Sequence, residues 1–156
     1  MANLKTWVSG LGLALIIAAA ACENASDALP AAQPSNLVIT QAQPADGDAT
    51  LTGIGGSYAS VGSGRKFVHL SQVVNGITHR VEVEYAISTD EIVSAVHDWG
   101  PGFYGTTYYQ NSANCEGAGC LGQIAVDSNA RTMTITGVSL ANGSTTSTLN
   151  GTLSWH

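Results

Sequence analysis

The residues that could carry acid–base chemistry in this sequence are four histidines: His69, His79, His97 and His156. Only His97 is followed directly by a carboxylate, at Asp98, and a histidine beside a carboxylate can act as a general base. Neighbouring residues of a strand point to opposite faces of a sheet, so a strand here would separate the two groups. No nucleophile elbow, metal-ligand motif or phosphate-binding loop accompanies the pair. We therefore expect no catalytic residue, and a hydrolase with a dispersed site is the least favoured function.

The three cysteines are Cys22, Cys115 and Cys120. The last two enclose only Glu116–Gly119, and in an oxidising compartment such a pair forms a local disulfide, which would contribute roughly 2 kcal/mol. A metal site would require two further ligands, and no histidine lies nearby in the sequence. A redox centre more often spaces its thiols as C-x-x-C. We expect a structural disulfide between Cys115 and Cys120, no metal and no cofactor.

The two carboxylates of Asp46-Gly47-Asp48 are the residues that could bind calcium. The other ligands of a calcium-binding loop are absent from the sequence that follows. Asp and Gly after a proline are typical of turns, so we interpret this segment as a polar turn.

The first 21 residues have the order of an export signal. Lys5 precedes an apolar run from Trp7 to Ala21, which is too short for a comfortable transmembrane helix and fits the apolar centre of a signal peptide. The run ends in four alanines and Cys22. Small residues directly before a cysteine resemble the lipobox of bacterial lipoproteins, which implies that Cys22 is lipidated and becomes the new N-terminus. Ala19 stands where that family usually has leucine, so conventional A-x-A cleavage stays an alternative.

Lipidation of Cys22 agrees with the cysteine count, because it leaves an even pair for the disulfide. In the same resemblance, an Asp after the cysteine often signals retention in the inner membrane, and this chain has Glu23 there. We expect an exported lipoprotein of the bacterial envelope, anchored in the outer membrane. A soluble periplasmic or secreted protein is the alternative.

The chain after the signal peptide divides into a tether and one domain. Residues 22–36 are rich in alanine, proline and polar residues and have no periodic apolar pattern, which is typical of a disordered tether. Residues 37–156 are enough for a single domain with its own core. We therefore expect residues 1–21 to be removed, 22–36 to form the lipidated tether and 37–156 to form the folded domain.

The strongest local signal is Asn75-Gly76 between two alternating runs, which predicts a type I′ hairpin with strands over 66–74 and 77–87. A two-residue turn fixes the register, so one mostly apolar face pairs Val74 with Ile77, Gln72 with His79, Leu70 with Val81, Val68 with Val83 and Lys66 with Tyr85. The other face is mostly polar and sets His69 opposite Glu82, as an exposed cross-strand pair. Turn chemistry and hydrophobic alternation therefore predict the same register.

The rest of the domain reads as short strands separated by turns. Ser88 and Glu91 resemble a capping box, but the β-branched residues that follow favour a strand over Ile92–Trp99 rather than a helix. Gly55-Gly56 is expected to end a strand, and Gly137 to form a bulge within one. The remaining strands are expected over 37–40, 49–54, 106–110, 121–126, 131–140 and 148–155. About eight strands at this spacing predict an all-β fold, an antiparallel β-sandwich or a small barrel.

Aromatic residues are concentrated in one segment. Between residues 99 and 109 lie Trp99, Phe103, Tyr104, Tyr108 and Tyr109, together with three glycines. One interpretation is that these rings fill one end of the domain. The other is a loop surface that stacks on sugar rings or binds a protein. Any ligand-binding site is expected here.

Two further motifs lie in the C-terminal third: Asp127, Arg131 and Thr132 in the pattern D-x-x-x-R-T, and the final T-L-N-G-T-L-S-W. With the N-terminal signal they resemble small uncharacterised lipoproteins of Gram-negative bacteria, which implies an envelope location and no particular activity. A net charge of −6 argues against a nucleic-acid partner. We expect a non-catalytic binding module, anchored to the membrane through its lipid, whose partner is a glycan or another envelope protein. The alternative is a structural or assembly protein of the envelope.

Overall fold

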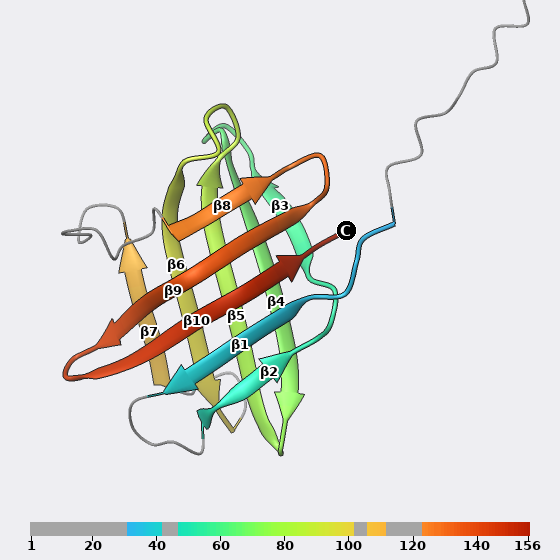
Figure 1. The fold of residues 1–156 in the computed structure, drawn as a ribbon. Coiled ribbons are helices and arrows are strands. Elements are labelled where there is room, and N and C mark those ends of the chain that lie inside the picture. The colour runs from blue at the N-terminus through green and yellow to red at the C-terminus, as the bar shows by residue number, and fades with distance from the viewer. Residues whose placement is uncertain (1–30, 42–46, 102–105, 112–122) are drawn as a thin grey trace, which may run out of the picture.

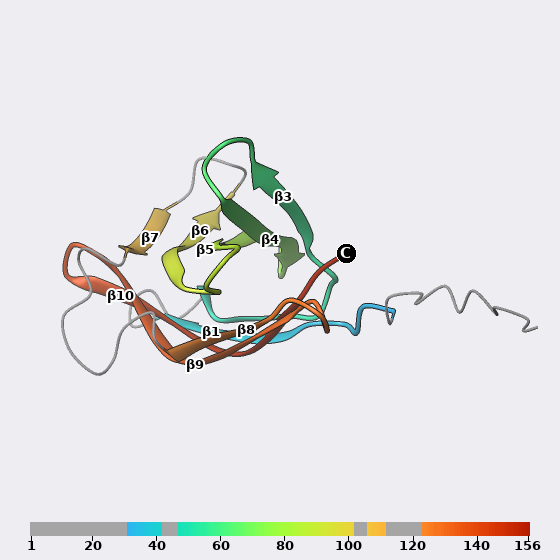
Figure 2. The same cartoon turned by 90° about the horizontal axis from the view of Figure 1, so that it is seen from above.

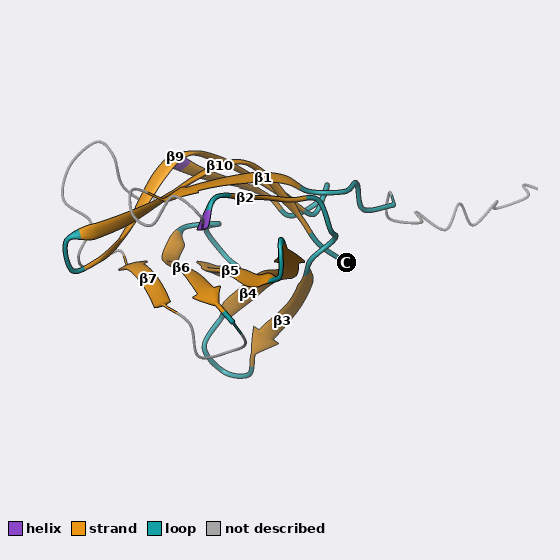
Figure 3. Ribbon diagram, turned by 90° about the horizontal axis from the view of Figure 1, so that it is seen from below, coloured by secondary structure: helices purple, strands orange, loops and turns teal. Residues whose placement is uncertain are grey.

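The computed structural model describes residues 31–41, 47–101, 106–111 and 123–156, and nearly all of this chain is strand or connecting loop (Figures 1 and 3). Among these residues, all pairings between strands are antiparallel, and one isolated bridge, between Gly55 and Trp155, is parallel. Within these ranges, no helix is long and apolar enough to cross a membrane. The strands are β1 (Asn36–Gln41), β2 (Ala49–Leu51), β3 (Gly56–Ser60), β4 (Arg65–Val74), β5 (Ile77–Ala86), β6 (Ile92–Gly100), β7 (Thr106–Asn111), β8 (Ile124–Asp127), β9 (Thr132–Asn142) and β10 (Thr145–Ser154).

The ten strands form two layers, as the view from above shows (Figure 2). The front sheet has the order β2-β1-β10-β9-β8, and the back sheet has the order β7-β6-β5-β4-β3. Among the described residues, backbone pairing joins the two sheets through Tyr109 and Ala141 at one side and through an isolated bridge between Gly55 and Trp155 at the other. In the described part of the chain the strands do not close into a barrel. The all-β prediction is thus confirmed, and the fold is a sandwich rather than a barrel.

The core lies between the sheets because the inward residues of each strand are apolar. In β1 and β5, buried residues alternate with more exposed ones, the pattern of strands with one face toward the core. The Tyr85 ring packs against Trp155, with ring centroids 6.5 Å apart. The apolar side chains that are at most 2% exposed are Leu37, Ile39, Leu51, Val68, Val81, Val83, Tyr85, Ala95, Tyr108, Met133, Ile135, Val138, Leu140, Leu149, Leu153 and Trp155.

The β4–β5 hairpin has the register that the sequence predicts. Val74 lies opposite Ile77 and Lys66 lies opposite Tyr85, with every pair between them in step. Asn75 and Gly76 have φ angles of 52° and 81°, which are the left-handed values that a type I′ turn requires. This hairpin therefore fixes which side chains of the back sheet point inward and which point outward.

The strand β3 was not expected, because Gly55-Gly56 was interpreted as the end of a strand. The chain instead leaves the front sheet after Leu51 and crosses to the back sheet, where β3 begins at Gly56. A Cβ atom on Gly55 would lie 2.5 Å from the backbone oxygen of His69, so glycine permits this close approach. Because the chain leaves the front sheet at this point, the strand predicted over 49–54 ends at Leu51.

Two other local predictions are confirmed. The segment after Glu91 is strand β6 rather than a helix. The β9–β10 register shifts between Leu149 and Gly151, which places a bulge at Gly137. Gly137 has a φ of 61°, and its N–H donates a hydrogen bond to Asn150 Oδ1 at 2.6 Å.

Candidate functional site

Two histidines of the back sheet face the interior of the sandwich. His79 is on β5 and His97 is on β6, and they are 1% and 0% exposed. His79 Nδ1 lies 3.2 Å from His97 Nε2, and the two rings are stacked with centroids 5.4 Å apart. One of the two nitrogens must carry the proton and the other must accept it.

This pair is connected to the opposite sheet. His97 Nδ1 lies 2.8 Å from the hydroxyl oxygen of Ser147, a fully buried residue on β10. On the other side of His97, the Tyr108 ring of β7 stacks at a centroid distance of 5.8 Å. We call His79, His97, Tyr108 and Ser147 the interior cluster. Its hydrogen bonds form a chain from Ser147 through His97 to His79, which links the two sheets.

The surroundings keep both imidazoles neutral. Burial, and secondarily the neighbouring His79, lowers the pKa of His97 to about 3. Burial also lowers the pKa of His79. A serine hydroxyl within hydrogen-bond distance of a neutral imidazole is the contact found in nucleophile–base pairs. Here Ser147 and His97 are both closed off from solvent, so no substrate can reach the hydroxyl, and the contact stabilises the core instead.

Asp98 lies on the opposite side of β6 from His97, as strand alternation predicts. Its Oδ1 accepts a hydrogen bond from the Thr107 hydroxyl at 2.8 Å, and its Oδ2 lies 3.8 Å from Arg80 Nη1. The carboxylate therefore does not orient His97, and the two residues cannot act together as a base.

The outer side of the back sheet carries an aromatic pair in which Tyr58 is exposed and Phe67 is partly buried. Tyr58 of β3 stacks on Phe67 of β4, with ring centroids 4.8 Å apart and planes 7° from parallel. Tyr58 remains 47% exposed, and its hydroxyl donates a hydrogen bond to Glu82 Oε2 at 3.4 Å. Burial of its hydroxyl and the Glu82 carboxylate raise the pKa of Tyr58, so this hydroxyl stays a donor at neutral pH.

Charged side chains surround this aromatic pair in hydrogen-bonded pairs. Arg80 donates to Glu82 at 2.7 Å, and Arg65 donates to Glu84 at 2.8 Å. The Ser94 hydroxyl also donates to Glu84, at 3.0 Å. We define the outer polar face as Tyr58, Phe67, Arg80, Glu82 and Asp98.

His69 lies opposite Glu82 in register, as the hairpin predicts, but its ring is placed differently from the expected cross-strand pair. The ring lies next to Gly56 and 6.0 Å from the Tyr58 ring, while Glu82 bonds to Arg80 and Tyr58. Among the described residues, His69 Nδ1 has no hydrogen-bond partner. Sequence analysis missed Tyr58 as a site residue because it missed β3. The segment Ser57-Tyr58-Ala59-Ser60 offered no clear strand signal, because its residues do not alternate between polar and apolar.

The aromatic segment predicted as a ligand site is only partly described. Tyr108 is 1% exposed and belongs to the interior cluster, which agrees with the packing interpretation for that ring. Trp99 is partly buried, and within the described residues its Nε1 has no hydrogen-bond partner. The backbone of Tyr109 pairs with Val96 and Ala141. Phe103 and Tyr104 lie outside the described residues.

Several other predicted residues also lie outside the described ranges: Cys22, Cys115, Cys120, Asp46 and the signal segment 1–21. Asp48 is described, and its carboxylate accepts a hydrogen bond from the Gln41 N–H at 2.7 Å, as a turn residue does. Within the described part of the chain, no group of three or more His, Cys, Asp or Glu side chains is placed to hold a metal ion.

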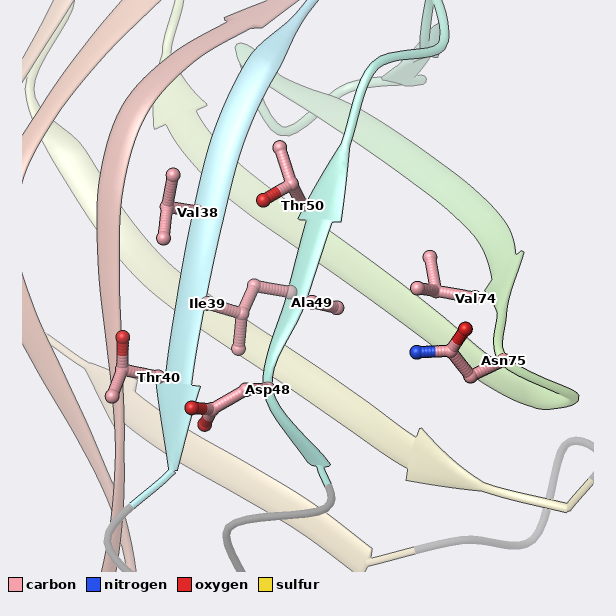
Figure 4. A pocket seen from close by; sticks show the side chains of 8 residues that line it. All are labelled: Val38, Ile39, Thr40, Asp48, Ala49, Thr50, Val74 and Asn75. Carbon is pink, nitrogen blue, oxygen red and sulfur yellow. The ribbon is translucent and has the colours of Figure 1, made fainter.

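A groove of about 400 Å³ lies between the β1–β2 edge and the turn of the β4–β5 hairpin (Figure 4). Asp48 supplies its one charged group, and that carboxylate is already engaged by the Gln41 backbone. The groove therefore offers less chemistry than the outer polar face. Its lining residues are Val38, Ile39, Thr40, Asp48, Ala49, Thr50, Val74 and Asn75.

Comparisons with protein-family models, curated proteins and solved structures find no match to this chain.

Proposed function

We propose that this protein is a non-catalytic binding module of the bacterial envelope, anchored by a lipid on Cys22, and that the outer polar face is its recognition surface. The observation that supports this proposal is the contrast in access. The Ser147–His97 contact is sealed in the core, whereas Tyr58 is exposed on a stacked platform beside Glu82 and Arg80. Exposed polar and aromatic groups held in place by neighbours favour binding over chemistry.

The tether fits this role. The lipobox-like sequence supplies the anchor, and Ser35 is already buried in the domain, so residues 23–34 would separate lipid and domain. Their composition predicts a disordered tether, and a tether of this length would reach roughly 20 Å and hold the domain close to the membrane surface. Confinement raises the local concentration of the binding face, so even weak single-site binding becomes effective.

The anchor is tested by fractionating Gram-negative cells that express the full-length chain or its Cys22→Ala variant. We expect the wild type in the membrane fraction, with a mass increase from the acyl groups on its N-terminal peptide. The variant should lose both. A wild-type chain that is soluble, or that is cleaved elsewhere with a free Cys22 thiol, would contradict the lipid anchor.

The binding role is tested by capture from solubilised envelope extracts on immobilised full-length protein. We expect the wild type to retain a component that the Tyr58→Ala variant retains less well. Val73 is 64% exposed and lies on the same side of β4 as Phe67, but outside the outer polar face. Val73→Ala is therefore the matched control and should behave as the wild type. Equal retention by all three proteins would rule out the outer polar face.

A further inference from the structure

We propose that the ligand of the outer polar face is an uncharged glycan, one sugar ring of which stacks on Tyr58 while its hydroxyls bind Glu82 and Arg80. This inference rests on the proposed function, because it names the ligand class of the same face. Three observations support it: the Tyr58 ring held by Phe67, the hydrogen-bonding groups of Glu82 and Arg80 beside that ring, and the pairing of the charged side chains around it.

Tyr58 is 47% exposed, and its ring is already held in place by its neighbours. Phe67 lies parallel to Tyr58 at 4.8 Å, the hydroxyl of Tyr58 is bonded to Glu82, and His69 lies against the pair at 6.0 Å. These contacts fix the Tyr58 ring before a ligand arrives, so binding costs little side-chain entropy. The face of an aromatic ring is electron-rich, and it attracts the weakly positive C–H groups that cover one side of a sugar ring.

Hydrogen-bonding groups lie beside the Tyr58 ring. Within the described part of the chain, the bonds to Glu82 use Oε2, so Oε1 stays available as an acceptor. Arg80 is 33% exposed beside it and supplies further N–H donors. A sugar hydroxyl both donates and accepts, so two adjacent hydroxyls match a carboxylate and a guanidinium placed side by side.

The charges of this face favour a neutral ligand. Within the face, Arg80 is paired with Glu82 and Asp98, and beside the face Arg65 is paired with Glu84. An anionic polymer would meet an acidic protein of net charge −6. A cationic ligand would have to compete with arginines that are already in place. A protein partner generally needs a contact of about 1,200 Å² or more, whereas here the exposed ring belongs to a single tyrosine.

The test measures binding of the full-length protein, purified in detergent, to defined oligosaccharides. The probes are neutral hexasaccharides of glucose, mannose, galactose and N-acetylglucosamine, with oligogalacturonate as the anionic comparison. For the neutral sugar that binds, we expect Tyr58→Ala to weaken the affinity about fivefold to tenfold. Glu82→Gln should weaken it severalfold, and Val73→Ala should leave it unchanged. Tyr58→Phe retains the stack and should bind within about twofold of the wild type.

Thermal unfolding of each variant shows whether it is folded. If Tyr58→Ala is not folded, the comparison of Tyr58→Phe and Glu82→Gln with the wild type still tests the inference. Absence of binding to every neutral probe overturns the inference, as does preference for oligogalacturonate or equal affinity of Tyr58→Ala and wild type. If Tyr58-dependent capture from envelope extracts yields a protein instead, the glycan inference fails while the proposed binding function stands. If no Tyr58-dependent capture occurs at all, both fail.

Discussion

The inner and outer sides of the β5–β6 pair carry polar groups of opposite character. On the inner side, His79 and His97 are buried, neutral and bonded to Ser147 of the other sheet. One residue further along each strand, Arg80 and Asp98 are charged, partly exposed and paired within their own sheet. Hydrogen bonds in the low-dielectric interior are costly to break, whereas exposed ion pairs contribute little to stability. The inner side therefore helps to join the two sheets, whereas the outer side is partly exposed to solvent.

The largest expected difference is between substitutions at two adjacent positions. His97→Ala leaves a cavity and removes the partner of both His79 and Ser147, so we expect the free energy of unfolding to fall by about 3–5 kcal/mol. Asp98→Ala removes only part of an exposed network and should cost less than about 1 kcal/mol. Urea unfolding of the two full-length variants measures both values. A similar loss of unfolding free energy in both variants would contradict the contrast between the inner and outer sides of the β5–β6 pair.

The second prediction concerns pH. The pKa of His97 is lowered in the folded protein to about 3, so the unfolded chain binds the proton first as the pH falls. The stability that neutral His97 contributes is therefore complete above about pH 6.5 and is lost progressively as the pH falls toward 3. Between pH 6.5 and 5 the loss should be about 2 kcal/mol, in a range where ordinary carboxyl groups do not titrate.

The matched variant for this measurement is His97→Gln, which retains a hydrogen-bonding group near Ser147 and removes the titrating ring. Its free energy of unfolding should depend less on pH in the same range, after allowance for its lower starting value. A wild-type protein equally stable at pH 6.5 and pH 5 would show that the interior cluster accepts protons readily.

The smallest expected effect is on the outer side. A double-mutant cycle of Arg80→Ala and Glu82→Ala should give a coupling energy below about 1 kcal/mol, because both side chains are partly exposed. Salt should reduce it further. A coupling of several kcal/mol, insensitive to salt, would mean that this side also contributes substantially to the stability of the fold.

The sequence predicted most reliably where two independent signals coincided. In the β4–β5 hairpin, the Asn75-Gly76 turn and the alternation of Leu70 and Val81 with polar residues specified one register, which the structure has. The bulge at Gly137 was likewise signalled by a glycine within an alternating strand. Local chemistry was sufficient in both cases, because turn geometry and strand periodicity depend on neighbouring residues.

The interior cluster could not be predicted in the same way. Strand alternation indicated correctly that His97 and Asp98 would separate, but nothing near His97 pointed to Ser147, which reaches it from β10. That contact depends on which strands of the two sheets face each other. Tyr58 was missed for a related reason, since β3 depends on the close approach of Gly55 to β4 rather than on a strong strand pattern.

The pairing of β1 with β10 has a consequence for the order in which the protein folds. The back sheet joins strands that follow one another along the chain, β3 to β7, so it can form from contacts between successive segments. In the front sheet Asn36 pairs with Thr152, and closing so long a loop is slow. Ser147 lies on the same late strand. We therefore expect His79 and His97 to stack within the back sheet first. The bond between His97 and the Ser147 hydroxyl should form later, when β10 docks.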